Sequence, residues 1–256
     1  MDLQIKGKRA IVTGATRGIG RAIAETLGDE GCNVAICARN ADQVADAVEA
    51  LKGKGIFACG DSVDIADGAA LKVWIQKAID LLGGLDILIS SAGAMAMGAH
   101  EDSWKRNLQI DILGAVNAVE ASLSALEASA KERGDAAIVA IGSTAGVSAG
   151  SPSSYGAVKG ALVHYIKGVS KQNASKHIRA NVVSPGMVYF EGGVWHRTEQ
   201  RAPEMFKTSL GRNPMGRMAS PRDIANAAVF LASPCSSYTT GINMLVDGGL
   251  TDRVNY

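Results

Sequence analysis

Apolar positions along the chain follow two alternating periods. Short runs of consecutive apolar residues, many of them β-branched, indicate strands that are buried on both faces. Between these runs, apolar residues recur every three or four positions, which is typical of one face of a helix. Strands of this kind, joined by helices, form a parallel sheet with right-handed crossovers. The predicted strands are residues 9–13, 33–37, 56–58, 85–89, 137–141, 179–183 and 244–246.

This alternation predicts an α/β fold of the Rossmann type. We expect a doubly wound parallel sheet with strand order 3-2-1-4-5-6-7 and helices on both faces. Asn40 and Gln43 have the spacing of a capping box at the start of one helix, and Ser220 with Pro221 opens another. No linker-like stretch divides the chain. We therefore expect one domain over residues 1–256, with a substrate-binding lid around residues 187–212.

Composition excludes several classes of function. The 256 residues carry 26 basic and 25 acidic side chains, and a net charge of +1 argues against binding to nucleic acid or a membrane by bulk charge. No apolar run approaches the roughly 18 residues of a membrane span, and the first residues lack the pattern of a secretion signal. The four cysteines form no C-x-x-C pair, which gives no support for a metal site. We expect a cytoplasmic protein without nucleic-acid, membrane or metal partners.

A glycine-rich segment, residues 13–20, follows the first predicted strand. Glycines let the backbone turn tightly and approach a pyrophosphate closely, and the start of the next helix offers free N–H groups to phosphates. A strand-to-helix turn without a ligand would use similar residues. The order of strand, loop, amphipathic helix and second strand nevertheless favours dinucleotide binding.

The end of the second predicted strand indicates which dinucleotide is bound. Sheets that bind NAD place an acidic residue there, but this chain has Ala38-Arg39-Asn40. Arg39, with Arg17 from the glycine-rich segment, has the charge to hold a 2′-phosphate. We therefore favour NADP(H) over NAD(H), although both arginines could also be solvated surface charges.

Further motifs follow in a fixed order. Asp64-Ile65 comes after the third predicted strand, Ser90-Ser91-Ala92-Gly93 after the fourth, and Pro185-Gly186 after the sixth. Ser143 precedes a Tyr-x-x-x-Lys motif formed by Tyr155 and Lys159, and Asp247-Gly248-Gly249 lies near the end. Together these motifs resemble those of the short-chain dehydrogenase/reductase superfamily, in its single-domain branch, over nearly the whole length. The resemblance implies NAD(P)-dependent interconversion of an alcohol and a carbonyl compound, usually by a homotetramer, with a dimer as the alternative.

The resemblance also implies which residues bind the cofactor. These are Gly14, Thr16, Arg17, Gly18, Ile19, Gly20, Arg39, Asp64, Ile65, Ser91, Ala92, Gly93, Tyr155, Lys159, Pro185, Gly186 and Val188.

Tyr155, Lys159 and Ser143 carry the predicted chemistry. Tyr155 and Lys159 are four residues apart, so they share one face of a helix. A nearby ammonium group favours the phenolate form of a tyrosine, so Tyr155 would be the acid in reduction and the base in oxidation. Lys159 would also hold the nicotinamide ribose, and the hydroxyl of Ser143 would hold the substrate oxygen. A Tyr/Lys pair at this spacing can also be an ordinary helix face.

The chain departs from the family at three places. Aligned on Trp104 and Gly114, the helix asparagine of the catalytic tetrad is Asp111, with Asn107 as a shifted alternative one turn earlier. An ionised aspartate accepts hydrogen bonds but donates none, so we expect an active but perturbed enzyme. Ser90-Ser91 replaces two amides that tie neighbouring strands, and Phe190 replaces a threonine that contacts the carboxamide.

The predicted substrate pocket is mainly apolar and suits a hydrophobic or cyclic carbonyl compound. A 3-oxoacyl thioester of fatty-acid type is the alternative, since Lys131, Arg133, Lys167 and Lys171 could dock an acidic carrier protein. A non-catalytic regulator that binds NADP is a third possibility. The predicted lining residues are Met95, Met97, Ser143, Val147, Tyr189, Phe190 and Trp195.

Overall fold

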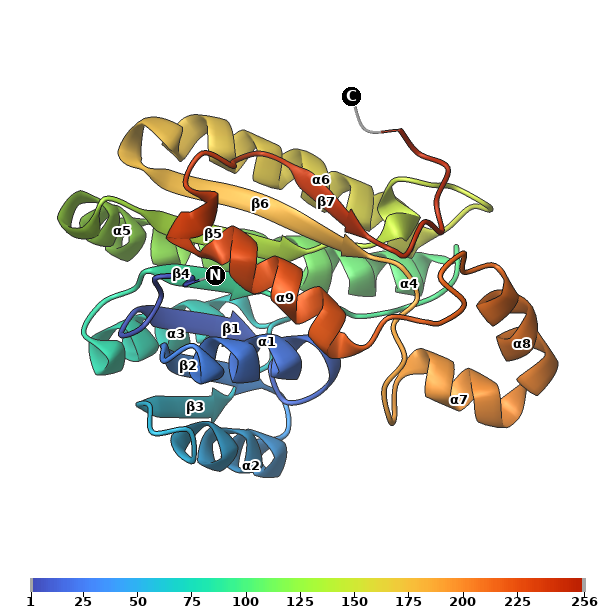
Figure 1. Cartoon of the computed structure of the whole chain (residues 1–256), viewed down its shortest axis with the longest axis horizontal. Helices are drawn as coiled ribbons and strands as arrows, with labels where there is room; N and C mark the ends of the chain where they lie inside the picture. Colours follow the sequence, from blue (N-terminus) through green and yellow to red (C-terminus); the bar gives the residue numbers. More distant parts are fainter. Residues whose placement is uncertain (1, 255–256) are drawn as a thin grey trace.

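Seven parallel strands form one sheet in the computed structural model, which describes residues 2–254 (Figure 1). The strand order is β3-β2-β1-β4-β5-β6-β7, which confirms both the predicted fold class and the predicted order. Each strand pairs with its neighbours in parallel register, so all carboxyl ends meet at the same edge. The strands are β1 (Arg9–Thr13), β2 (Asn33–Ala38), β3 (Ala58–Ser62), β4 (Ile87–Ser90), β5 (Ala136–Ile141), β6 (Ile178–Pro185) and β7 (Asn243–Val246).

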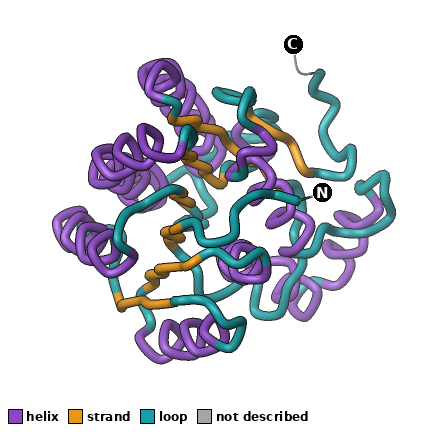
Figure 2. The backbone as a smooth tube through the Cα atoms, turned by 60° about the vertical axis from the view of Figure 1, so that its left-hand side comes forward, coloured by secondary structure: helices purple, strands orange, loops and turns teal. Residues whose placement is uncertain are grey.

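Helices cover both faces of the sheet (Figure 2). Each face has its own apolar core. One core is formed with α1 (Gly18–Asp29), α2 (Ala41–Lys52) and α9 (Pro221–Ala232). The other is formed with α3 (Gly68–Leu82), α5 (Gly114–Arg133) and α6 (Ser154–Asn173). No helix within residues 2–254 is both long enough and apolar enough to cross a membrane.

The third strand lies further along the chain than the sequence predicted. Residues 56–58 were expected to form it, but β3 is Ala58–Ser62, and the Phe57 side chain is 47% exposed. An edge strand pairs on one side only and tolerates polar residues, so a short apolar run does not mark its position. Gly60 fits here because a Cβ atom on it would lie 2.7 Å from the carbonyl oxygen of Ile36.

The predicted capping box at Asn40 is only half formed. The Asn40 side chain accepts a hydrogen bond from the N–H of Gln43, as predicted. The Gln43 side chain does not return to Asn40, because its oxygen accepts a hydrogen bond from the hydroxyl of Thr16 at 3.2 Å. Both halves of a capping box are present at Ser220, where Asp223 supplies the carboxylate. Thr16 therefore joins the glycine-rich segment to α2.

The remaining helices lie beyond the carboxyl edge of the sheet, toward which the strand arrows point in Figure 1. A short helix, α4 (Glu101–Asn107), continues through a π-helical turn (Leu108–Leu113) into α5. The segment predicted to form a lid contains α7 (Val194–Arg201) and α8 (Pro203–Gly211). Three short 3-10 turns complete the elements: Thr144–Gly146, Ala174–Lys176 and Pro234–Ser236.

Candidate active site

Tyr155 and Lys159 lie one turn apart near the start of α6, and both are almost completely buried. Their exposed fractions are 8% and 4%. The Nζ atom of Lys159 lies 5.8 Å from the centroid of the Tyr155 ring. The helix begins at this point because the Ser153 side chain caps it by accepting a hydrogen bond from the N–H of Gly156. The predicted pair therefore forms, and it faces the protein interior at the carboxyl edge of the sheet.

The ammonium group of Lys159 is held between two acceptors. It donates to the carbonyl oxygen of Ile141 at 2.8 Å, where β5 ends, and it forms an ion pair with Asp111 at 2.9 Å. Burial favours the neutral amine, but the negative charge of Asp111, and that of Tyr155 when ionised, favour the ammonium more strongly. The net effect raises the pKa of Lys159 above its usual value.

Asp111 lies in the π-helical turn, and its carboxylate is fully buried. One oxygen faces Lys159, and the other accepts a hydrogen bond from the backbone N–H of Ala94 at 2.8 Å. A Cβ atom on Gly93 would lie 3.1 Å from Asp111 Oδ1 and 3.8 Å from Lys159 Nζ. Asp111 therefore joins α6 to the loop that follows β4, next to the predicted cofactor turn.

Asn107, the shifted alternative for the tetrad position, makes other contacts. Its fully buried side chain bonds to both backbone groups of Ala96, at 3.2 and 2.9 Å, and donates to the hydroxyl of Ser154 at 3.0 Å. Ser154 in turn donates to the carbonyl oxygen of Gly98 at 2.7 Å. Asn107 thus fastens the loop after β4 to the start of α6, beside Tyr155.

Ser143 lies two residues beyond the end of β5, in an extended conformation at the start of the Thr144–Gly146 turn. Its side chain accepts a hydrogen bond from the N–H of Ala145 at 3.2 Å. The turn crosses α6 at very short range: a Cβ atom on Gly156 would lie 2.7 Å from the carbonyl oxygen of Ala145. The close crossing brings the Ser143 turn against the helix that carries Tyr155 and Lys159.

The glycine-rich segment is packed too tightly for any side chain at two of its positions. A Cβ atom on Gly20 would lie 2.2 Å from the carbonyl oxygen of Gly14, and one on Gly14 would lie 2.8 Å from the Cα atom of Ala92. Gly14 also has φ +68, which favours glycine. This compact turn opens α1, whose first N–H groups point along the helix axis toward the loop. These residues fit the pyrophosphate of a dinucleotide.

The turn after β4 is tied to β1 by a hydroxyl group. The backbone N–H of Ser91 donates to Thr13 Oγ1 at 3.2 Å. This bond uses the backbone of Ser91, so it does not depend on the side chain at that position.

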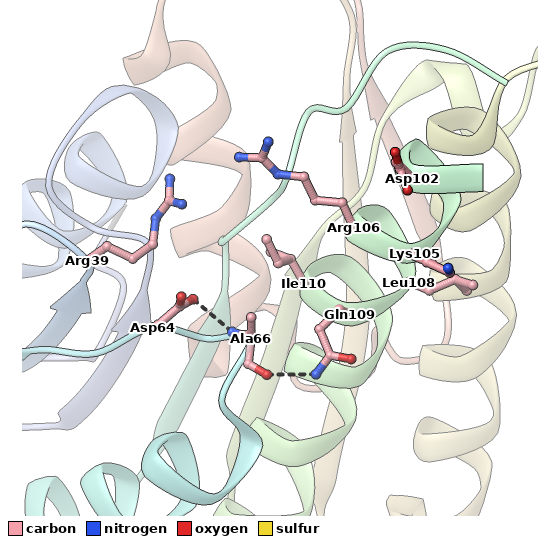
Figure 3. Close-up of a pocket in the computed structure, with 9 residues that line it drawn as sticks. All are labelled: Arg39, Asp64, Ala66, Asp102, Lys105, Arg106, Leu108, Gln109 and Ile110. Carbon is pink, nitrogen blue, oxygen red and sulfur yellow. Dashed lines mark hydrogen bonds between the residues drawn. The ribbon is translucent and has the colours of Figure 1, made fainter. Parts of the chain in front are cut away.

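A cavity of about 790 Å³ lies where β2 and β3 end (Figure 3). It contains Arg39 and Asp64, both predicted to bind the cofactor. Asp64 accepts a hydrogen bond from the N–H of Ala66 at 3.0 Å, which forms a tight turn. Ile65 points elsewhere, because its side chain packs against Gly114 at the start of α5. The position of the cavity fits the adenosine part of a dinucleotide.

In the segment after β6, the backbone N–H and C=O groups of Val188 remain free of the bridge that its neighbours form. Val188 pairs with Ala219 in an isolated parallel bridge, whose hydrogen bonds use the carbonyl oxygen of Met187 and the N–H of Tyr189. Because alternate residues of a strand point their N–H and C=O to opposite sides, those of Val188 face the other way. This geometry fits the predicted backbone contact of Val188. Pro185 ends β6, and Gly186 donates to Val246 at 3.0 Å.

The predicted substrate residues divide into separate groups. Tyr189 faces the lid, where its hydroxyl donates to Glu199 and its ring meets that of Phe206 edge-on at 5.9 Å. This contact with Glu199 raises the pKa of Tyr189. Phe190 packs against Gly18, since a Cβ atom there would lie 2.6 Å from its ring. Phe190 therefore lies over the glycine-rich segment rather than in a separate apolar wall.

The other predicted pocket residues lie on three segments. Met95 and Met97 are 45% and 65% exposed on the loop after β4. Val147 follows the Ser143 turn and is partly buried. Trp195 is partly buried in the first turn of α7.

Two functional candidates escaped the sequence reasoning. Asn107 was considered only for the tetrad, yet it fastens the loop after β4, and Arg106 lines the cavity that contains Arg39. The sequence could have indicated that Arg106 and Ile110 lie on one helix face, because they are four residues apart. The sequence does not indicate that this face points to the cavity, because the position of α4 is known only from the structure.

Comparisons with known proteins agree with this geometry. The model of a family described as enoyl-(acyl carrier protein) reductase matches residues 14–251. The chain is 34% identical to isoepoxydon dehydrogenase of Penicillium expansum over 251 residues, covering 96% of this chain and 95% of that protein. It is 32% identical to a 3-oxoacyl-acyl-carrier-protein reductase of Staphylococcus aureus, covering 95% and 98%.

Solved structures give the same result. The crystal structure of L-sorbose reductase from Gluconobacter frateurii, complexed with NADPH and L-sorbose, matches with a TM-score of 0.90 and 29% identity, covering 99% of this chain and 100% of that one. The fold and the site define a Rossmann-type oxidoreductase. The chain belongs to the short-chain dehydrogenase/reductase family and is an NAD(P)-dependent oxidoreductase.

Proposed function

We propose that the protein interconverts a ketone and a secondary alcohol with NADP(H), and that Tyr155 is its acid and base. The observation that carries this proposal is the burial of Lys159 beside the Tyr155 ring at the carboxyl edge of the sheet. An ammonium group in this position stabilises the phenolate, so the hydroxyl of Tyr155 can release and recover a proton during the reaction.

The residues of the site divide the work of a carbonyl reduction. The bound nicotinamide supplies the hydride in reduction and accepts it in oxidation. Tyr155 donates its hydroxyl proton to the substrate oxygen, and Ser143 holds that oxygen by a hydrogen bond. Lys159 stabilises the phenolate that remains, and Asp111 keeps Lys159 charged and in place. Gly14 and Gly20 allow the tight turn that opens α1, whose first N–H groups would bind the pyrophosphate.

The preference for NADP(H) is supported by the residues where β2 ends. Arg39 follows this strand directly, at the position where NAD-binding sheets place a carboxylate. Arg17 lies at the start of α1 and is exposed. L-Sorbose reductase, a related structure, was solved with NADPH.

We further propose a mainly apolar or cyclic carbonyl compound as the substrate. The exposed Met95 and Met97 on the loop after β4 support an apolar contact surface. The similarity to isoepoxydon dehydrogenase supports a small-molecule substrate, whereas the similarity to the carrier-protein reductase keeps a 3-oxoacyl thioester as the second candidate.

The basic residues considered for carrier docking weaken that second candidate. Arg133 ends α5, which leads into the amino end of β5, and its guanidinium pairs with Asp86 at 3.6 Å. Lys167 donates to the carbonyl oxygen of Gly241 at 2.9 Å. The amino end of β5 lies at the edge of the sheet opposite the catalytic residues. Within residues 2–254, Lys131 and Lys171 are then the cations of the predicted patch that form no ion pair or side-chain hydrogen bond.

The test is a screen for NADPH consumption with cyclic ketones, aryl ketones, steroids and 3-oxoacyl thioesters. For the best substrate, Tyr155→Phe should lower kcat by about a hundred-fold or more, since positioned acid-base groups contribute factors of that size. NADPH should still bind. Tyr165→Phe, on the same helix and half-buried, is the matched control and should keep full activity. NADPH binding without turnover of any substrate would favour the non-catalytic regulator instead.

The exposed surface near β7 and the state of the cysteines bear on assembly and location. We propose a single domain that forms a homotetramer in the cytoplasm. Support for self-association comes from the edge strand β7, which is only partly buried, and from the exposed Tyr238 and Ile242 next to it. The four cysteines are free, and burial raises the pKa of Cys32 and of Cys37 to about 12, as expected of unreactive thiols in a reducing compartment.

A further inference from the structure

Two guanidinium groups from opposite walls point into the cavity beside β2 and β3. Arg39 comes from the end of β2, and Arg106 comes from the last turn of α4 (Figure 3). Both side chains are exposed, and within residues 2–254 neither forms an ion pair or a side-chain hydrogen bond. Like charges across a cavity repel, so this arrangement is stabilised when an anion lies between them.

The other charged residues of the cavity do not supply that anion. Asp64 turns its carboxylate to the N–H of Ala66. Lys105 pairs with Glu101 at 2.6 Å. Asp102 lies four residues before Arg106 on the same helix, a spacing that allows an ion pair, but the described residues form none there. The acidic residues of the cavity wall therefore do not pair with Arg39 or Arg106, and both guanidinium groups can bind an anionic ligand.

We propose that Arg106 binds the 2′-phosphate of the cofactor from the side opposite Arg39, so that the two form a clamp. The inference rests on the proposed function, because it deepens the proposed preference for NADP(H). The glycine-rich segment follows β1 and fits the pyrophosphate. The cavity lies where β2 and β3 end, which is the position expected for the adenosine and its 2′-phosphate.

The chemistry of the walls fits this ligand. A guanidinium group presents parallel N–H donors that match phosphate oxygens, and two of them suit a doubly charged phosphate. Ile110, one turn after Arg106, adds an apolar surface for the adenine ring. The volume of about 790 Å³ exceeds the needs of a free phosphate and suits a nucleoside phosphate. Selectivity for NADP(H) thus depends on α4 as well as on the β2 end.

The test compares binding of NADP⁺ and NAD⁺, which differ only in the 2′-phosphate, by isothermal titration calorimetry without substrate. Arg106→Leu should raise the Kd of NADP⁺ about ten-fold and leave the Kd of NAD⁺ within about two-fold. Arg106→Lys keeps the charge but loses the parallel donors, so its Kd for NADP⁺ should lie between those of the unaltered protein and Arg106→Leu. Lys131→Leu removes one exposed positive charge at the far end of α5 and is the matched control.

Each outcome decides a different point. Unchanged NADP⁺ binding in Arg106→Leu, or an equal loss for both cofactors, would overturn the clamp alone. A ten-fold loss in Lys131→Leu would show a general charge effect and would also overturn it. If the unaltered protein binds NAD⁺ but not NADP⁺, the proposed NADP(H) function fails, and the clamp fails with it.

Discussion

The ion pair between Lys159 and Asp111 is the residue-scale feature that most distinguishes this site. Both side chains are withdrawn from water, so each would be costly alone, and each offsets the charge of the other. The carboxylate acts on the site in two ways: it keeps Lys159 protonated, and it opposes formation of a second negative charge on Tyr155. An amide at the same position would do neither.

Asp111→Asn should therefore move the pH dependence of turnover. The raised pKa of Lys159 falls when the carboxylate is removed, so the alkaline limb of kcat/KM should move to lower pH. The contribution of this pair to folding is present below the pKa of an unfolded lysine and is lost as the pH rises through the raised value. Asp111→Asn should therefore be less stable than the unaltered protein mainly below about pH 10, where the ion pair contributes to folding. Asp46→Asn, an exposed exchange of the same kind on α2, is the control. Superimposable profiles for all three proteins would remove Asp111 from the proton relay.

Sequence reasoning reached these residues only in part. The four-residue spacing of Tyr155 and Lys159 predicts a shared helix face, and the family resemblance, aligned on Trp104 and Gly114, assigns Asp111 to the tetrad position. The bonds to Ile141 and Ala94 could not be predicted, because they join backbone groups of segments far apart in the chain. The direction of Arg106 was hidden for a similar reason: the exposed residues of a short helix carry no apolar pattern that fixes their orientation.

At the scale of elements, α4 and the π-helical turn support the loop after β4. Met95 in this loop has φ +51, a left-handed conformation that costs a residue with a Cβ atom about 1 kcal/mol or more. Its neighbours hold it there: Ala94 donates to Asp111, and Ala96 makes two bonds with Asn107. π-Helical turns occur often at functional sites, and this one contains Asp111.

Asn107→Leu should release this loop. Three hydrogen bonds of a buried side chain are lost, which should lower the free energy of unfolding by about 2–3 kcal/mol and raise KM for the carbonyl substrate about ten-fold. The Kd of NADPH should change little, since the glycine-rich segment makes none of these bonds. Ser122→Ala on α5 removes a buried hydroxyl group that has no hydrogen-bond partner among the described residues, and should leave KM unchanged. Equal rises of KM in both variants would mean a general loosening of the helices.

The comparison of predicted and observed elements shows where periodicity carries information. Central strands such as β5 were predicted almost residue by residue, because burial on both faces leaves a continuous apolar run. The edge strand β3 was misplaced because three of its five residues are polar or glycine. The capping partner of Asn40 was only half correct because the contact between Gln43 and Thr16 is tertiary.

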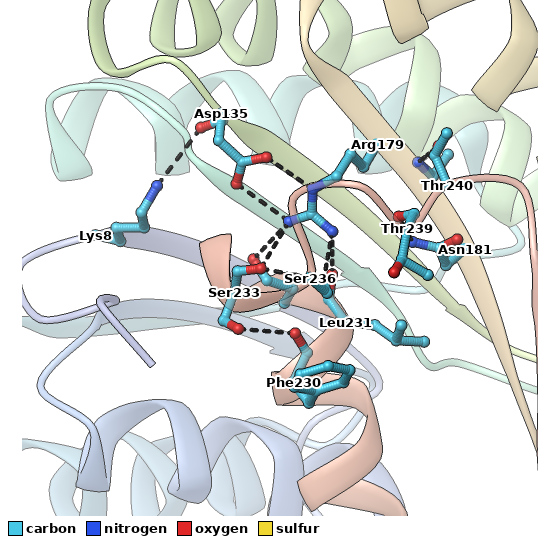
Figure 4. Close-up of polar contacts among 12 residues, drawn as sticks. Lys8, Asp135, Arg179, Asn181, Phe230, Leu231, Ser233, Ser236, Thr239 and Thr240 are labelled. Carbon is cyan, nitrogen blue, oxygen red and sulfur yellow. Dashed lines mark hydrogen bonds and ion pairs between the residues drawn. The ribbon is translucent and has the colours of Figure 1, made fainter. Parts of the chain in front are cut away.

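At the scale of the whole molecule, the two edges of the sheet have different tasks. Chemistry-bearing residues collect at the carboxyl edge, on loops and helix starts. At the amino edge, Arg179 at the start of β6 connects distant parts of the chain (Figure 4). Its guanidinium binds both oxygens of Asp135 at 2.7 and 3.1 Å and reaches Ser236 and the last carbonyl groups of α9. The network joins β6, the start of β5 and α9 without touching the site.

Stability and binding should therefore separate when this network is broken. Arg179→Met leaves the carboxylate of Asp135 without its partner in a largely buried position, and should lower the free energy of unfolding by about 3–5 kcal/mol in urea titrations. Adding Asp135→Leu should restore part of that loss, because no uncompensated charge remains. Arg222→Met breaks an arginine–aspartate pair that is exposed, also on α9, and should cost at most about 1 kcal/mol. The Kd of NADP⁺, measured in buffer where all variants are folded, should stay the same throughout. A change in that Kd for Arg179→Met would show that the amino edge also shapes the cofactor site.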